Sequence, residues 1–276
     1  MKIIIAGKSD IASLALIYLK INTNYKIVAV PSKSDLKEHS WQMSLSQTAR
    51  ELGIETSENI DNFLVDDNII FSLEYDKIIK INENNKNEIF NIHFSLLPKY
   101  RGVYTSIFPI LNNEKISGVT LHKIDKGIDT GEIVDQIQFN IENDTAYDLY
   151  KKYNYYGFEL FKRNIDSIIN KNYNSFKQSK AESSYFSRKD LDFTKRIITK
   201  KDLYNKNANE IYNILRAFYF PVYQYPIFEN RIIKQFKLID SIHINYEQEI
   251  INLNENKKIL KTKKGSILVD LGGQFE

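Results

Sequence analysis

The stretch Asn91-Ile92-His93-Phe94-Ser95-Leu96-Leu97-Pro98, which closes on Tyr100-Arg101-Gly102, decides how this chain of 276 residues is interpreted. In an extended segment residues i and i+2 project to the same side, so Asn91 and His93 are predicted to face one cavity while Ile92 points into the sheet. An amide and an imidazole placed in this way can orient and deprotonate an attacking nucleophile.

The residues around this pair predict a short buried strand that ends in a turn. Pro98 and Gly102 disfavour a continued strand after the histidine. The strand is therefore expected over Glu88 to Ile92, with its carboxyl end at a crevice, which is where open α/β sheets bind their ligands.

A second motif, Asp125-Lys126-Gly127-Ile128-Asp129-Thr130-Gly131, brackets two acids with two glycines and predicts a tight loop. The residues before it, Gly118 to Ile124, and after it, Glu132 to Phe139, alternate as strands do. Asp129 lies 129 − 93 = 36 residues after His93, which leaves room for one helix and one strand. The loop is therefore expected to bring a carboxylate back to His93.

Each motif alone has a simpler interpretation. A single histidine near a strand end is usually a core or surface residue, and an Asp-x-x-x-Asp loop is usually a turn with solvated acids. The two motifs in fixed order with Ser-Leu-Leu-Pro and Arg-Gly are far more specific for a reactive site.

The remaining pattern predicts an α/β fold with a Rossmann-like, mostly parallel sheet, helices on both of its faces, and a small C-terminal β-rich region. We expect a catalytic domain over 1–180 and a C-terminal helix and β-rich region over 181–276. Further strands are predicted at Ile3 to Ala6, Lys26 to Val30, Asn68 to Leu73, Ile232 to Ile239, Ile259 to Lys261 and Ser266 to Leu271, and helices at Ile11 to Lys20, Leu45 to Leu52, Tyr104 to Leu111, Tyr147 to Ile169 and Ala208 to Phe218.

The first turn, Gly7-Lys8-Ser9-Asp10, can offer backbone amides and a helix N-terminus to an anion, which makes Ser9 a candidate substrate-binding residue. The turn lacks the three-glycine fingerprint of dinucleotide-binding proteins. A nicotinamide cofactor is therefore not expected.

Composition excludes several classes of protein. The chain is 42% hydrophobic and 26% charged, as is ordinary for a soluble globular protein, and no apolar run is long enough to span a bilayer. The net charge is only +3, which gives no electrostatic reason to expect a nucleic-acid partner. With no cysteine there is no disulfide, which is consistent with a cytoplasmic protein. No metal site is predicted.

The combined motifs from Asn91 to Gly131 resemble the folate-dependent formyltransferase family, which includes the ribonucleotide, methionyl-tRNA and sugar N-formyltransferases. The resemblance implies that Asn91, His93 and Asp129 form the catalytic trio and that 10-formyltetrahydrofolate donates the formyl group. Many members of the family have proline after the histidine, where this chain has Phe94.

The chemistry of formyl transfer explains these residue types. An amine that attacks a formyl carbon must lose protons while negative charge develops on the formyl oxygen. General-base help of the kind that His93 can give is typically worth roughly a hundred- to ten-thousand-fold in rate. The amide of Asn91 can donate to the oxyanion, a role worth about 2.7 to 4 kcal/mol in a protease. Asp129 is expected to orient the imidazole and stabilise its charged form.

The resemblance also implies ligand contacts outside the trio. Residues 72–79 resemble the pterin-binding loop and the helix that follows it, and Lys77 is expected to reach a substrate phosphate, although a solvated lysine is the simpler interpretation. The expected folate contacts are Ser72, Leu73, Glu74, Tyr75 and Asp125.

The C-terminal part holds two further candidates. The segment from Ser184 to Asp190 resembles the one that follows the catalytic domain in sugar and tRNA formyltransferases, and its Arg188 is expected to bind a phosphate. The aromatic segment from Phe220 to Pro226 can stack a nucleobase, with Tyr223 as the contact, or can form a hydrophobic seam between two domains.

Length, the short segment from Ser32 to Arg50 and the aromatic tail favour a sugar N-formyltransferase. The expected substrate is a nucleotide-linked amino deoxysugar, in particular a dTDP-amino-dideoxyhexose used for bacterial surface polysaccharide, and a homodimer is expected. The alternatives are a methionyl-tRNA formyltransferase and a non-catalytic binding module on the same fold.

Overall fold

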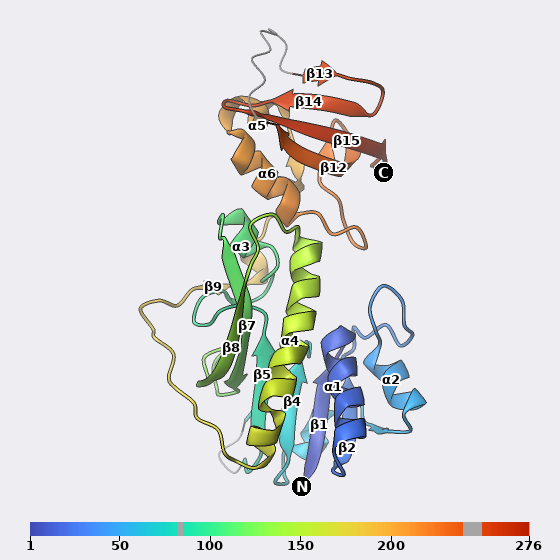
Figure 1. Cartoon of the computed structure of the whole chain (residues 1–276), viewed down its shortest axis with the longest axis vertical. Helices are drawn as coiled ribbons and strands as arrows, with labels where there is room; N and C mark the ends of the chain where they lie inside the picture. Colours follow the sequence, from blue (N-terminus) through green and yellow to red (C-terminus); the bar gives the residue numbers. More distant parts are fainter. Residues whose placement is uncertain (82–84, 240–249, 276) are drawn as a thin grey trace. The chain divides into compact units, whose positions relative to one another are not determined.

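The computed structural model describes residues 1–81, 85–239 and 250–275, which form two compact units (Figure 1). Unit 1 contains Met1–Thr105, Ile116–Asn140 and Lys151–Phe186, and unit 2 contains Ser106–Lys115, Ile141–Tyr150 and Ser187–Glu276. These units are defined by contacts between residues, whereas a domain is a part of the chain that folds by itself. The division into domains 1–180 and 181–276 stays a prediction.

Unit 1 is built on a seven-stranded, mostly parallel sheet, which confirms the predicted fold class. Strands β3, β2, β1, β4 and β5 run parallel in that order, and β7 and β8 continue the sheet antiparallel. The strand order reverses between β1 and β4, and ligands of such sheets bind beside the carboxyl ends of the strands at this point. The bounds are β1 (Lys2–Gly7), β2 (Lys26–Pro31), β3 (Glu55–Thr56), β4 (Ile69–Leu73), β5 (Glu88–His93), β7 (Ile116–Lys123) and β8 (Ile133–Asn140).

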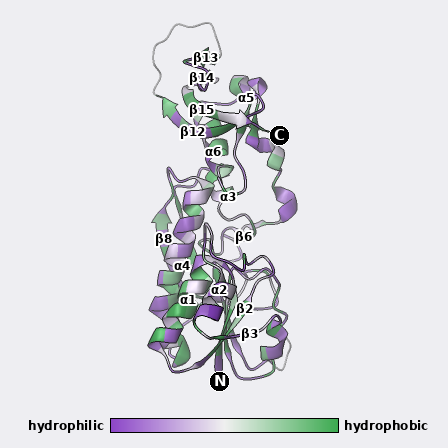
Figure 2. Cartoon of the chain, turned by 90° about the vertical axis from the view of Figure 1, so that its right-hand side faces the viewer, coloured by the Kyte–Doolittle hydropathy of each residue, from purple (hydrophilic) through white to green (hydrophobic). Residues whose placement is uncertain are grey.

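Helices α1 (Ser9–Asn22) and α4 (Ala146–Ile169) lie over one face of this sheet, and α2 (Leu45–Glu51) contacts α1 (Figure 1). On α4, the buried ring of Phe161 meets Phe71 of β4 edge to face at 5.0 Å. Hydrophilic and hydrophobic residues alternate around α4, as a helix with one buried face requires (Figure 2).

The other face of the sheet is covered by the short 3₁₀ helix η1 (Ile60–Phe63) and by residues 75–81. We predicted a helix in the second of these segments, and this prediction is wrong. Glu74 has a left-handed φ of 61°, and both Ile79 and Ile81 pack against the core, a spacing of two that suits extended backbone.

The predicted helix over Tyr104 to Leu111 is wrong in its first half. The helix α3 covers only Phe108–Leu111, and a turn precedes it. Tyr104 cannot belong to a right-handed helix, because it adopts a left-handed φ of 58°. The neighbouring pair β6 (Arg101–Gly102) and β9 (Tyr185–Phe186) forms a small parallel sheet within unit 1.

Unit 2 packs helix α6 (Ala208–Ala217) against a six-stranded sheet, which confirms the predicted β-rich region. The sheet order is β10-β11-β12-β15-β14-β13. The short helix α5 (Lys200–Asn205), opened by a capping box of Thr199 and Asp202, was missed. The strands are β10 (Ile197–Ile198), β11 (Ile227–Phe228), β12 (Arg231–Ile239), β13 (Ile250–Asn252), β14 (Lys257–Lys261) and β15 (Ser266–Gln274).

Arg216 of α6 holds the segment Ile141–Tyr150 within unit 2. Its guanidinium is buried and donates to the carbonyls of Ile141 at 3.1 Å and Asp144 at 2.9 Å. Burial lowers the pKa of Arg216. Among the described helices, none has the length and apolar character needed to cross a bilayer.

Replacing Phe161 with alanine is expected to destabilise the protein by about 3 to 5 kcal/mol, because it opens a cavity where α4 meets the sheet. Tyr155 lies on the same helix with 59% of its surface exposed, so its replacement with alanine is expected to change the free energy of unfolding by only about 0.5 kcal/mol. Urea unfolding of the two variants tests this packing, and equal losses would contradict it.

Candidate active site

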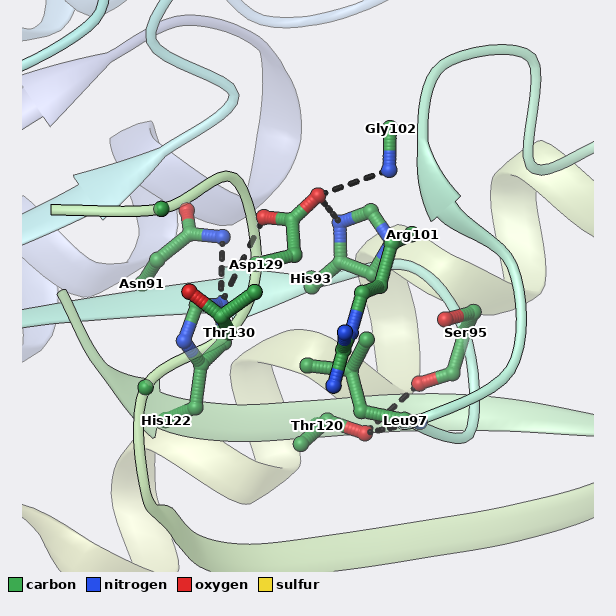
Figure 3. Close-up of polar contacts among 12 residues, drawn as sticks. Asn91, His93, Ser95, Leu97, Arg101, Gly102, Thr120, His122, Asp129 and Thr130 are labelled. Atoms are coloured by element: carbon green, nitrogen blue, oxygen red, sulfur yellow. Dashed lines mark hydrogen bonds and ion pairs between the residues drawn. The ribbon is translucent and has the colours of Figure 1, made fainter. Parts of the chain in front are cut away.

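Strands β5 and β7 place three side chains on one face at the carboxyl end of β5. Asn91 and His93 are two residues apart on β5, and Asn91 pairs in register with His122 of β7. Residues directly opposite each other in an antiparallel pair share a face of the sheet. Asn91, His93 and His122 therefore point into the same space (Figure 3).

Asp129 joins these side chains from the loop between β7 and β8 (Figure 3). Its Oδ2 atom lies 3.5 Å from Nδ1 of His93, and its Oδ1 atom lies 3.7 Å from Nε2 of His122. The backbone N–H of Gly102 donates to Oδ2 at 2.8 Å. The structure thus brings Asn91, His93 and Asp129 together from separate segments of the chain.

The contacts of His93 assign its ring nitrogens. Nε2 lies 2.8 Å from the carbonyl oxygen of Tyr100, and because a carbonyl can only accept, Nε2 carries the proton. In the neutral ring the lone pair is then on Nδ1, which faces Asp129. The side chain keeps 9% of its surface exposed, so the imidazole is largely withdrawn from water.

His122 is the site residue that the sequence did not identify, because we interpreted it only as part of an alternating strand. Its Nδ1 donates to the carbonyl of Lys123 at 2.8 Å, so in the neutral ring Nε2 accepts from the amide nitrogen of Asn91 at 3.1 Å. Burial lowers the pKa of His122 to about 4, with His93 adding to this effect and Asp129 opposing it. A neutral His122 thereby fixes which end of the Asn91 amide points toward it.

The loop that carries Asp129 is closed by its own residues. Asp125 accepts from the backbone of Gly127 at 2.9 Å and from the hydroxyl of Thr130 at 2.6 Å. Only glycine fits at position 131, because a Cβ there would lie 1.8 Å from the carbonyl oxygen of Lys123. The carboxylate of Asp125, an expected folate contact, therefore already shapes the loop.

The turn after His93 is held by a buried hydroxyl. Thr120 of β7 donates to the carbonyl of Ser95 at 2.7 Å and accepts from the backbone of Leu97 at 3.1 Å. Gln136 donates to the carbonyl of Leu97 at 3.0 Å. Figure 3 shows the contacts of Thr120 with Ser95 and Leu97. This network fixes the path of the chain that leads to Tyr100, whose carbonyl accepts from His93.

The other expected folate contacts lie at the end of β4. Ser72 and Leu73 are buried, and the carbonyl of Leu73 accepts from the backbone of Lys8 at 3.1 Å. The carbonyl of Glu74 accepts from the hydroxyl of Ser32 at 3.1 Å. Burial raises the pKa of Tyr75, whose hydroxyl has no hydrogen-bond partner within the described residues. Their contact with folate stays a prediction.

The four expected substrate contacts are divided between the units, with Ser9 and Lys77 in unit 1 and Arg188 and Tyr223 in unit 2. The hydroxyl of Ser9 is buried and donates to Asn154 of α4 at 2.9 Å, so it already has a partner inside the fold. Lys77 and Arg188 are exposed.

Tyr223 is 67% exposed and stacks on Phe220 with ring centroids 5.2 Å apart. Phe220 also meets Tyr147 and Tyr150 edge to face within unit 2. Within residues 1–81, 85–239 and 250–275, no group of three or more acidic, histidine or cysteine side chains is arranged to hold a metal ion.

A histidine, a carboxylate and an amide at the carboxyl edge of a mostly parallel sheet have the chemistry to support acyl transfer to a nucleophile. The pattern of the family described as formyl transferase matches residues 3–165. The chain belongs to the formyl transferase family.

Two solved structures resemble the whole chain. WlaRD, a sugar 3N-formyl transferase studied with dTDP and 5-N-formyl-THF, is 44% identical with a TM-score of 0.88, over 100% of this chain and 99% of that one. An N-formyltransferase from Helicobacter canadensis, in complex with folinic acid and dTDP-3-aminofucose, is 42% identical with a TM-score of 0.88, over 99% of this chain and 100% of that one.

Curated relatives are more distant. A bifunctional polymyxin resistance protein, ArnA, from Wigglesworthia glossinidia brevipalpis is 30% identical over 100% of this chain, which spans only 43% of that relative's length. A methionyl-tRNA formyltransferase from Finegoldia magna is 27% identical over 97% of this chain and 90% of its own length.

The buried, neutral His122 predicts a stability that depends on pH. Its folded pKa of about 4 lies below the ordinary histidine value of 6.5, so the unfolded chain binds more protons between these pH values and stability falls with falling pH. The expected loss from this group between pH 7 and pH 5 is about 2 kcal/mol.

Unfolding by urea at pH 7 and pH 5, compared with the variant His122→Gln, measures this contribution. The glutamine can still accept from Asn91 but does not titrate, so the variant is expected to lose less stability on acidification. An equal loss in both proteins would show that His122 is not held neutral by the fold.

Proposed function

We propose that this protein transfers the formyl group of 10-formyltetrahydrofolate to the amine of a nucleotide-linked amino deoxysugar. The observation that carries the proposal is the approach of Asp129 to Nδ1 of His93, next to Asn91, in a chain 42 to 44% identical along its length to sugar N-formyltransferases. We further propose a dTDP-linked sugar with its amine at carbon 3, because both of those proteins are described with such chemistry.

We propose that Nδ1 of His93 accepts the proton, and the hydrogen bond that occupies Nε2 supports this choice. Attack forms a bond between the amine nitrogen and the formyl carbon, and the bond from that carbon to the folate nitrogen breaks. Because Nε2 is held by the Tyr100 carbonyl, the amine proton goes to the Nδ1 lone pair. The new Nδ1–H then faces the carboxylate of Asp129, which stabilises the imidazolium until the proton passes to the folate nitrogen.

Asn91 is positioned to stabilise the developing oxyanion. One amide hydrogen is donated to Nε2 of His122, which leaves the second hydrogen for another acceptor. Because the buried His122 already holds the other hydrogen of the same amide, this donor needs little reorganisation during the reaction. Formyl transfer to an amine requires a proton acceptor, a group that stabilises the charged acceptor and a donor to the oxyanion. The imidazole, the carboxylate and the amide can fill these three roles.

Methionyl-tRNA formyltransferase is the second candidate, supported by the 27% identical relative from Finegoldia magna. The net charge of +3 gives it little support, since tRNA binding relies on many phosphate contacts. A non-catalytic binding module on this fold is a third candidate, and the assembled trio argues against it. A role in surface polysaccharide synthesis, a homodimer and a cytoplasmic location stay predictions.

Replacing His93 with asparagine is expected to lower kcat by roughly a hundred- to ten-thousand-fold, because the site loses its proton acceptor. The affinity for the nucleotide sugar, measured by calorimetry, is expected to stay close to that of the unchanged protein. The matched control is His39→Asn, which makes the same substitution at a histidine whose side chain is 32% exposed and which lies outside the trio. Unchanged turnover in His93→Asn would refute the assigned base.

A substrate panel tests the proposed acceptor. With 10-formyltetrahydrofolate as donor, we expect dTDP-3-amino-dideoxyhexoses to be formylated faster than their 4-amino isomers, a UDP-linked amino sugar or methionyl-tRNA. Preferred formylation of methionyl-tRNA, with a rate that falls steeply as salt rises, would instead establish the second candidate. Binding of a sugar without any turnover would favour the third.

A further inference from the structure

We infer that Gln178 is a positioning residue that holds Asp129 in its reactive place by clamping the loop of Asp129 to Arg101. Gln178 lies in the irregular segment after α4, between exposed neighbours, and neither the sequence motifs nor the proposed mechanism uses it. The catalytic part of this inference rests on the proposed formyl transfer.

All the hydrogen-bonding capacity of the Gln178 amide is used. Its Nε2 donates to the carbonyls of Asp129 at 2.9 Å and Gly131 at 2.7 Å. Its Oε1 accepts from Arg101, at 3.1 Å from Nε and 2.6 Å from Nη2. The opposite orientation of the amide would set its oxygen against two carbonyls and its nitrogen against two donors, so the orientation is unambiguous.

Both segments that Gln178 joins, the Asp129 loop and Arg101–Gly102, are also connected at the carboxylate of Asp129. Arg101 directly precedes Gly102, whose N–H donates to Oδ2 of Asp129 at 2.8 Å. Gln178 therefore fixes Asp129 through its main chain on one side and through the Arg101–Gly102 segment on the other. Asp129 needs such support, because it has a left-handed φ of 54°, a conformation that is unfavourable for residues other than glycine.

The rest of the segment is attached to the same region. The hydroxyl of Ser175 donates to Glu132 at 2.7 Å, and the backbone groups of Phe176 and Ile133 exchange two hydrogen bonds of 2.9 Å each. Gln178 is thus delivered to the loop by a fixed stretch of chain. Arg101 of the opening motif, which is not one of the three proposed reactive residues, has its side-chain partner in this stretch.

The variant Gln178→Glu tests the inference, because it keeps the oxygen that accepts from Arg101 and replaces the donor to the two carbonyls with a second oxygen. Small displacements of a reactive group cost up to roughly a hundredfold, so we expect kcat to fall by about ten- to a hundredfold with KM values for donor and sugar within about twofold. Arg101→Lys, which keeps one donor for Oε1, is expected to lose less.

Two controls separate positioning from a general loss of folded protein. Gln138→Glu makes the same change on the exposed side of β8, away from the clamp, and is expected to keep the kcat of the unchanged protein. In an Asp129→Asn background, Gln178→Glu is expected to add little further loss, because it acts through Asp129. Independent, multiplying losses would overturn the inference.

A crystal structure of Gln178→Glu decides the clamp without reference to activity. We expect the Asp129 loop to move and the bond from Gly102 to Oδ2 to lengthen or break, and an unmoved loop would overturn the inference. If the unchanged protein transfers no formyl group, the proposed function fails while this structure still decides the clamp. If the unchanged protein and Gln178→Glu turn over equally, the inference alone fails.

Discussion

The hydrogen bond from the Gly102 backbone to Asp129 is the interaction on which the site depends. At 2.8 Å it is shorter than the 3.5 Å approach of the same oxygen to His93, so the main chain, and not the imidazole, sets the position of the carboxylate. A charge placed in advance by the fold needs no reorganisation when the imidazolium forms. The site therefore depends on backbone groups, in particular the Gly102 N–H and the Tyr100 carbonyl, as well as on the side chains of the trio.

The sheet supplies the rigid part of this arrangement, and the loops supply the adjustable part. Asn91 and His122 are opposed on neighbouring strands, where register fixes their separation. Asp129 lies in the loop between β7 and β8 with a left-handed φ of 54°, and the contacts from Gly102 and Gln178 hold it in this conformation. The site needs both parts, because strand β5 carries His93 and the loop carries the carboxylate that faces it.

The sequence predicted those parts of the fold and site that follow from local rules. Local patterns predicted the strand that carries Asn91 and His93 and the glycine-bounded loop that carries Asp129. The spacing of apolar residues predicted the other strands and the long helices. His122 was missed because alternation explains a strand residue equally well without a role in the site. The partners of Gln178 lie 47 to 77 residues away, and no local pattern encodes such contacts.

The division of the chain between its two units has a consequence for recombination of its gene. The chain passes from one unit to the other after residues 105, 115, 140, 150 and 186. A single genetic crossover near residue 186 would therefore exchange most of unit 2 but leave its two inserted segments with their original parent. Exchange of the whole of unit 2 between two related chains would need a crossover at every one of these boundaries.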